Sequence, residues 1–364
     1  MAAPSPSALR RSSFRQVPRA NSCGGTLTEG AAALGLTHTG RTPVDQPDTP
    51  EKDPLAMIPA RSTEHVGDVT VNLHGMWMLQ AMLDIATVAP ELSAVPYGAP
   101  RESTWISGDP RIEQLQAAGV VGQDGHVITQ VAARMRVLAA PDVEVAILIA
   151  RGALSWKGRI DVNDPATWRR DIPDNQLQIV LARRDGRWVS AARAGDDITI
   201  DDVRFDGGSA AWLRDVLVEQ LNAVHPVEAS RIEPMNLPYE DIVSAAAQRA
   251  DAGDDPQREL PLRALGIPPA ALAELGALLD EPVVEAVVYA RVHTDARSNT
   301  SATALNIRDT DAGRVVLYQM LAPRGSTQDW MVIAPGSPGQ ILLGIQAVLS
   351  SVNARDWENH ERFA

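Results

Sequence analysis

Cysteine is almost absent from this chain of 364 residues, in which Cys23 is the only one. One cysteine forms no intramolecular disulfide and no thiolate metal cage, which fits a reducing compartment. Lysine is nearly missing as well, with two lysines against 31 arginines. The net charge of −13 disfavours nucleic acid and anionic membrane as partners, because both require a basic surface.

Long hydrophobic runs are also missing, since no segment approaches the roughly 18 apolar residues of a membrane span. We therefore expect no membrane insertion. The common local patterns of catalytic and metal sites are absent too, among them HExxH, CxxC, the P-loop, GxGxxG after a strand and the GxSxG elbow. The sequence predicts a protein that is not an enzyme, has no small-molecule substrate and uses no metal or cofactor.

Two groups of aspartates are candidate sites for a metal cation. Asp196-Asp197 and Asp201-Asp202 flank a short predicted strand, and paired carboxylates bind hard cations. Side chains alternate along a strand, however, so each pair is divided between two faces and ordinary strand ends are the better interpretation. Asp309–Gly313 is similar to the start of a calcium loop but lacks the later acidic ligand, which favours a hairpin turn.

The first 65 residues differ in composition from the rest. They are rich in Pro, Ser, Ala, Gly and Thr and show no sustained period of 2 or 3.6 residues. This composition predicts a disordered leader over residues 1–65. Met57 lies just before the first strand-like segment, so a true start at Met57 is an alternative. The folded part is expected to begin near Asp68.

The remaining sequence contains the same order of elements twice: helix, buried strand, hairpin, strand and helix. Val143–Arg151 and Val283–Arg291 are apolar runs that predict well-buried strands. The matched pairs in the two halves are Arg151 with Arg291, Val143 with Val283, Ala146 with Ala286, Ala150 with Ala290 and Gly186 with Gly313. Two such halves side by side predict one continuous antiparallel sheet, with helices on one face or at the ends. The other face would be open for a partner.

A long polar segment, Ala153–Asn175, follows the first buried strand. A loop of about 20 residues inside a compact domain is uncommon and usually functional or mobile. It contains Trp156 and Trp168. Tryptophans in a loop often anchor a binding partner, and packing against the sheet is the alternative. Arg183 and Trp188 lie in the next hairpin, where arginine beside tryptophan is typical of interfaces but equally of soluble hairpins.

Several whole segments resemble one known family. They are Val71–Pro96, Gln130–Gly152, Asp171–Val203, Leu265–Ile267 with the helix after it, Ala286–Arg291 and Asp311–Pro335. The family is EspG, the cytosolic chaperones of the mycobacterial type VII (ESX) secretion systems, and the pattern is closest to the member that serves the fifth ESX system. The resemblance covers roughly residues 68–352 and stops at the leader, which supports a start at Met57.

The resemblance implies a mixed α/β fold of the α+β kind, with helical bundles and two pseudo-twofold-related subdomains around a central antiparallel sheet. The expected bounds are 68–225 for the N-terminal subdomain, 226–352 for the C-terminal subdomain and 353–364 for a tail. It also implies a cytoplasmic function. EspG chaperones bind PE–PPE heterodimers at the tip of the PPE protein, cover its apolar residues and direct the soluble substrate to their own ESX system.

Two other classes of function remain open at this point. One is a structural or accessory component of the secretion machine, against which the acidic surface and the missing span argue. The other is an enzyme with a dispersed active site, against which the absence of any local nucleophile–base or metal spacing argues.

The resemblance also places the binding surface. In the family it involves the loop between the second and third strands, the central sheet and the C-terminal helical subdomain. These regions map here to Ser155–Asn175, to outward residues of Leu177–Arg193, and to helices near Leu237–Ala252 and Leu260–Leu279. The predicted contact residues are Trp156, Trp168, Arg183, Trp188, Ser190 and Arg193.

These contact residues do not all lie on one face of the predicted sheet. The period of two along a strand puts Trp188 and Ser190 on one face and Arg193 on the other. Only one of these two sets is therefore expected to contact a partner.

Overall fold

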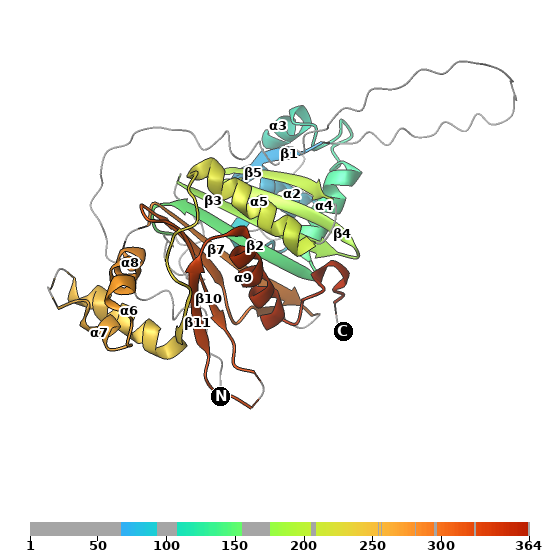
Figure 1. The fold of residues 1–364 in the computed structure, drawn as a ribbon. Coiled ribbons are helices and arrows are strands. Elements are labelled where there is room, and N and C mark those ends of the chain that lie inside the picture. Colours follow the sequence, from blue (N-terminus) through green and yellow to red (C-terminus); the bar gives the residue numbers. More distant parts are fainter. Residues whose placement is uncertain are drawn as a thin grey trace, which may run out of the picture.

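The computed structural model describes residues 67–92, 108–154, 175–204 and 209–362, apart from 254, 256, 281, 295–296 and 324. Its centre is one antiparallel sheet, with helices packed on both faces (Figure 1). The predicted α+β class is confirmed. The leader and the alternative start at Met57 lie outside the described residues, and the exact subdomain and tail bounds remain predictions.

The first half of the described chain forms one edge of the sheet and its helices. Its elements are β1 (Val69–Asn72), α2 (Leu73–Met82), the short helical turn η2 (Pro90–Leu92), α3 (Arg111–Ala117), α4 (Thr129–Ala139), β2 (Val143–Arg151), β3 (Gln176–Arg184), β4 (Arg187–Ala194), β5 (Asp197–Val203) and α5 (Ser209–Val224).

The second half repeats the same order. Its elements are β6 (Met235–Pro238), α6 (Tyr239–Ala252), α7 (Leu260–Arg263), α8 (Pro269–Leu279), β7 (Val284–His293), β8 (Ser298–Thr300), β9 (Leu305–Thr310), β10 (Gly313–Met320), β11 (Trp330–Pro335), α9 (Pro338–Ser351) and the turn η5 (Trp357–Asn359).

The strand order reveals the symmetry of the two halves. The sheet runs β1-β5-β4-β3-β2-β7-β9-β10-β11-β6, and β8 pairs with β7. A pseudo-twofold axis between the antiparallel strands β2 and β7 relates β1 to β6, β5 to β11, β4 to β10 and β3 to β9. The two pseudo-twofold-related subdomains that the resemblance implied are therefore confirmed.

The predicted residue-by-residue match of the two buried strands is wrong, however. Residues paired across antiparallel strands point to the same face, and Ile147 pairs with Val288 while Ala146 pairs with Tyr289. Ala286 lies in the same core as Ile147 and Val288, hence on the face opposite to Ala146. A twofold axis perpendicular to the sheet preserves each face, so an alignment of Ala146 with Ala286 is displaced by an odd number of residues. The other matched pairs of this strand share the displacement.

The hairpins show the same displacement. In the first, Asp185 and Gly186 form a two-residue turn with φ of 50° and 75°, the left-handed pair that such tight hairpins favour. In the second, Thr310 pairs with Gly313, so the turn residues are 311 and 312 and Gly313 already belongs to β10. Gly186 and Gly313 are therefore neighbours of equivalent positions and not equivalents.

Helices cover both faces of the sheet, whereas the prediction was helices on one face or at the ends. On one face α5 and α9 lie side by side across both halves, over a core that includes Ile147, Ile179, Val288 and Ile307 (Figure 1). On the other face two separate cores form. One packs α2, α3 and α4 against β3, β4 and β5, and the other packs α6, α7 and α8 against β10 and β11. The central strands of this second face lie between the two helical layers.

Candidate partner-binding site

The middle of the second face carries a strip of side chains that we call the central strip. Cross-strand pairing places its members on one face of β2, β7 and β9. They are Leu148, Ala150, Glu285, Val287, Tyr289 and Asn306. The side chains from β7 and β9 are half-buried, whereas the other face of β7 is fully buried.

The centre of the strip is apolar. Leu148 and Ala150 cluster with Leu154, and Val287 and Tyr289 pack against them. Leu154 is the last described residue before the long loop, and its backbone N–H donates to the Glu285 carboxylate at 2.8 Å. The loop between β2 and β3 therefore leaves the sheet directly at the central strip.

A buried ionic cluster closes one end of the strip and joins the two halves of the molecule. Arg291 on β7 donates to Glu91 of η2 and to Glu144 of β2, and the Tyr289 hydroxyl also donates to Glu91. His293 lies 3.1 Å from Glu144 through its Nε2 atom. Burial and the charge of Glu91 raise the pKa of Tyr289 well above its usual range, so its hydroxyl remains a hydrogen-bond donor.

The ionisation of Glu144 follows from its two neighbours. Burial favours the neutral acid, but the hydrogen bond with His293 and the charge of Arg291 outweigh it and hold the pKa of Glu144 below its ordinary value. The guanidinium of Arg291 is buried as well, and the two carboxylates raise its pKa, so it remains charged. The cluster is thus a fixed charged contact between η2, β2 and β7.

The opposite end of the strip connects to the C-terminal helices. Asn306 donates to Glu285 at 3.0 Å, and Arg308 on β9 lies 3.5 Å from the same carboxylate. Arg308 also donates to the carbonyl of Leu278 in the last turn of α8, at 2.6 Å. The strip and the helical layer of α6 to α8 are thereby held in one arrangement.

The predicted contact residues are placed as follows. Trp156 and Trp168 lie outside the described residues. Arg183 is buried and donates to the His360 carbonyl, with Asp142 at 3.5 Å. Arg193 is fully buried and donates to the carbonyls of Gly195 and Leu92, at 2.9 and 3.2 Å.

Trp188 and Ser190 are buried as well. The Trp188 ring meets the edge of Trp357 with centroids 4.6 Å apart, inside the core below α5 and α9. Val189 and Ala191 lie in the core of α2 and α4, which confirms that alternate residues of β4 face opposite sides. Both sides are covered, so contact of these four residues with a partner remains a prediction.

Sequence reasoning did not identify the central strip. It depends on the pairing of β2 with β7, strands far apart in the sequence. The signal was nevertheless present in Val284–His293, where Ala and Val alternate with Glu285, Val287, Tyr289 and Arg291. Such alternation predicts a strand with one buried and one partly exposed face.

Asp201, Asp202 and Asp309 form ion pairs with arginines. Asp202 accepts from Arg134 and Arg187, each at 2.9 Å, and Asp309 accepts from Arg314 at 2.7 and 2.9 Å. No group of three or more His, Cys, Asp or Glu side chains suits a metal ion in the part of the chain that the structure describes. The 309–313 segment forms the predicted hairpin.

No helix within the described ranges has both the length and the apolar character needed to cross a membrane.

Comparison with known proteins gives the family. The model of the EspG family matches residues 72–347. The chain belongs to the EspG family.

Individual members of the EspG family are similar over most of the chain. The ESX-5 secretion-associated proteins EspG5 of Mycobacterium marinum and Mycobacterium tuberculosis are each 40% identical over 296 residues, which is 81% of this chain and 97% of the relative. The ESX-1 secretion-associated protein EspG1 of Mycobacterium tuberculosis is 24% identical over 84% of this chain and 95% of its own length. The predicted resemblance, including likeness to the member that serves the fifth ESX system, is confirmed.

A solved structure agrees with the EspG fold. It is the Mycobacterium tuberculosis type VII secretion system chaperone EspG5 in complex with a PE25–PPE41 dimer. The match has a TM-score of 0.70 and 38% sequence identity, and it covers 81% of this chain and all of the EspG5 chain.

Proposed function

We propose that this EspG chain binds PE–PPE heterodimers as a chaperone of type VII secretion and directs them to their ESX system. The observation that carries the proposal is the structural match between this chain and an EspG5 chain that was solved in complex with a PE–PPE dimer. The match covers the whole length of that EspG5 chain. We place its action in the cytosol, without catalysis and without a cofactor. The binding partner is the PPE protein, through its tip.

The central strip is the proposed contact surface on the sheet. Val287 and Tyr289, the half-buried part of its apolar centre, suit an apolar protein tip, and the polar ends give hydrogen-bonding groups at the rim, the usual anatomy of a protein interface. The Arg291–Glu91 ion pair at one end and the hydrogen bond from Arg308 to the Leu278 carbonyl at the other hold the strip in place before a partner arrives, which lowers the entropy lost on binding. Burying the half-exposed Val287 would contribute to the affinity through the hydrophobic effect.

Trp156 and Trp168 belong to the same proposal, because their loop leaves the sheet at Leu154 on the strip. Arg183, Trp188, Ser190 and Arg193 stay in it with an indirect role: they fix the shape of β3 and β4 through the contacts described above. We propose that both subdomains, 68–225 and 226–352, contact the partner and that residues 353–364 are a tail.

A single arginine in the strip tests the proposal. Val287→Arg places a charge in the apolar centre, next to Glu285, and is expected to weaken binding of a PE–PPE heterodimer of the ESX-5 type about tenfold or more by calorimetry. Leu343→Arg is the matched control, because Leu343 is 49% exposed on α9, on the opposite face of the sheet.

The control variant should bind within about twofold of the unchanged chain. Circular dichroism of both variants verifies folding, and Val287→Ala serves if the arginine variant does not fold. Unchanged affinity of folded Val287 variants would exclude the strip as the contact surface. Absence of any binding by the unchanged chain would exclude the function.

A further inference from the structure

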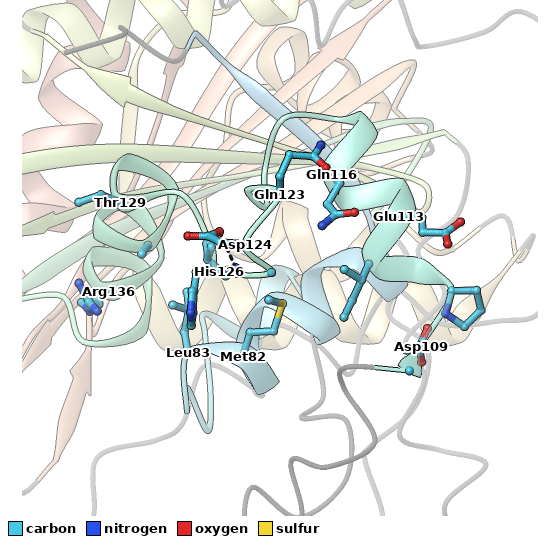
Figure 2. A pocket seen from close by; sticks show the side chains of 16 residues that line it. Met82, Leu83, Asp109, Glu113, Gln116, Gln123, Asp124, His126, Thr129 and Arg136 are labelled. Carbon is cyan, nitrogen blue, oxygen red and sulfur yellow. Dashed lines mark hydrogen bonds between the residues drawn. The ribbon is translucent and has the colours of Figure 1, made fainter. Parts of the chain in front are cut away.

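Two surface hollows lie at equivalent places in the two halves. The first, of about 910 Å³, is lined by the end of α2, by α3, by the turn before α4 and by α4 (Figure 2). The second, of about 370 Å³, is lined by the end of α6, by α7 and by α8. Both α2 and α6 follow directly after the matched edge strands β1 and β6.

Six lining residues of the first hollow have pseudo-twofold counterparts that line the second. Buried leucines fix the alignment of α3 with α7, since Leu115 and Leu262 each stand four positions before a glycine with positive φ, Gly119 and Gly266. The lining residues that correspond are Leu83 with Arg249, Ile112 with Glu259, Gln116 with Arg263, Thr129 with Pro269, Ala132 with Leu272 and Arg136 with Gly276.

The C-terminal hollow is bridged from within. The buried Arg249 donates to Glu259 at 2.9 Å and to Asp280 at 3.0 Å, which joins α6 to the start of α7 and the end of α8. Gly276 borders the pair, because a Cβ atom there would lie in van der Waals contact, at 3.5 Å, with the Arg249 Nη2 atom. The helices around this hollow therefore hold one another.

The N-terminal hollow has no counterpart of the Arg249–Glu259 pair among the residues that the structure describes. Its counterparts of Arg249 and Glu259 are Leu83 and Ile112, which with Met82 form an apolar floor. An extra turn, residues 121–128, stands where the second half has only Pro268 between Ile267 and α8. This turn adds a wall to the hollow and is held by the Val121–Val127 bridge, so the enlarged space is part of the fold.

Two oppositely charged residues line this hollow at its two sides. Figure 2 shows Arg136 of α4 on one side and Glu113 of α3 on the other, and both are exposed. Neither side chain has a hydrogen bond or ion pair within the described residues. The other acidic residues have partners: Asp109 lies 3.2 Å from Arg111, and Asp124 accepts from the His126 backbone at 3.1 Å.

We propose that the N-terminal hollow is a second docking site, for a peptide segment of a protein partner other than the PE–PPE substrate. The segment inserts an apolar side chain over Leu83 and Ile112 and presents an acidic residue to Arg136 and a basic residue to Glu113. Charge complementarity at these two positions sets its direction. The hollow shares no lining residue with the central strip, so both sites can be occupied together.

Selection of peptides on the full chain tests this site. A phage library of random 12-residue peptides is panned against the purified protein, and enriched peptides are synthesised and titrated. We expect an apolar residue flanked by one acidic and one basic residue. Arg136→Glu should weaken these peptides about tenfold, and the double variant Glu113→Arg/Arg136→Glu should select the reversed charge order.

A second variant copies the C-terminal bridge into the N-terminal hollow. Leu83→Arg/Ile112→Glu recreates the Arg249–Glu259 pair and should abolish peptide binding while leaving the protein folded. The matched control is Arg263→Glu, an exposed charge reversal on the C-terminal hollow, which should change affinity by less than about twofold. Arg136→Glu, at an exposed position, carries the test if the double variant does not fold.

Three results would overturn the proposal. One is a selection without a shared pattern, or peptides that bind the bridged variant equally well. Another is loss of PE–PPE binding in Arg136→Glu, which would make the substrate itself the occupant. The third is a change of oligomeric state in the same variant by sedimentation, which would assign the hollow to a second copy of the chain.

Discussion

At the scale of single residues, Glu144 gives the clearest pH dependence. His293 and Arg291 keep its pKa below the ordinary value of glutamate despite burial. The stability that it contributes is therefore complete above about pH 4.3, the unfolded value, and is lost as the pH falls through the lower folded value. Glu144→Gln should lower the free energy of unfolding by about 3 kcal/mol at pH 7.

Urea unfolding at a series of pH values measures this effect. The loss of stability on acidification should be shallower in Glu144→Gln than in the unchanged chain, whereas Glu113→Gln, at an exposed glutamate without a partner, should leave the curve unchanged. Parallel curves for Glu144→Gln and the unchanged chain would show that another group carries the acid sensitivity.

Trp188 shows what single residues in a sequence conceal. Its place beside arginine suggested an interface, but Trp357, 1% exposed and from the last turn of the chain, covers it. Nothing local to either residue indicates the other, because only the folded sheet brings them together. Trp156 and Trp168, the other predicted anchors, depend on the loop and stay predictions.

Truncation of the second ring tests this contact. Trp357→Ala should destabilise the protein by about 3–5 kcal/mol through the cavity that it leaves. Trp188→Ala and the double variant complete a cycle, in which a coupling of about 1 kcal/mol is expected for an edge-to-face pair. Additive effects in denaturant unfolding would contradict a direct energetic contact between the two rings.

At the scale of elements, the two hairpins differ in how much their glycines matter. Gly313 has φ of 113°, and a Cβ atom there would lie 2.7 Å from the Cα atom of Ser230. Gly186 has φ of 75° with open space around it. Gly313→Ala should therefore cost about 3 kcal/mol through strain and a backbone clash, and Gly186→Ala about 1 kcal/mol through strain alone.

Thermal unfolding of these two alanine variants separates the two causes. The difference between their midpoints should be several degrees, with Gly313→Ala the less stable. Equal midpoints would mean that the contact with Ser230 relaxes without cost.

Much of the element order follows from the sequence. The apolar run Val143–Arg151 and the Asp185-Gly186 turn gave β2 and the first hairpin, because burial and turn geometry are local properties. The register of the repeat did not follow, because a shift of one residue exchanges the two faces and the apolar strand β2 looks alike on both. The helices on both faces were missed although the sequence contained a signal for them, since a fully apolar strand such as β2 indicates two covered faces.

At the scale of the whole molecule, the pseudo-twofold arrangement accounts for both proposed sites. The central strip lies beside the axis, where β2 meets β7. An ion pair with Glu91 ties one end to η2, and a hydrogen bond to the Leu278 carbonyl ties the other end to α8. The N-terminal hollow lies away from the axis, where one half departs from its counterpart. The class of partner was predictable from the family resemblance. The position of the central strip was not, because it depends on the pairing of β2 with β7, which lie far apart in the sequence.

The most direct measurement of the central claim is the mass of the complex after co-expression with a PE–PPE heterodimer of the ESX-5 type, by size-exclusion chromatography with light scattering. The account predicts a stable complex with one copy of each of the three chains. Separate elution of the folded chain from PE–PPE heterodimers of this and every other ESX system would contradict it.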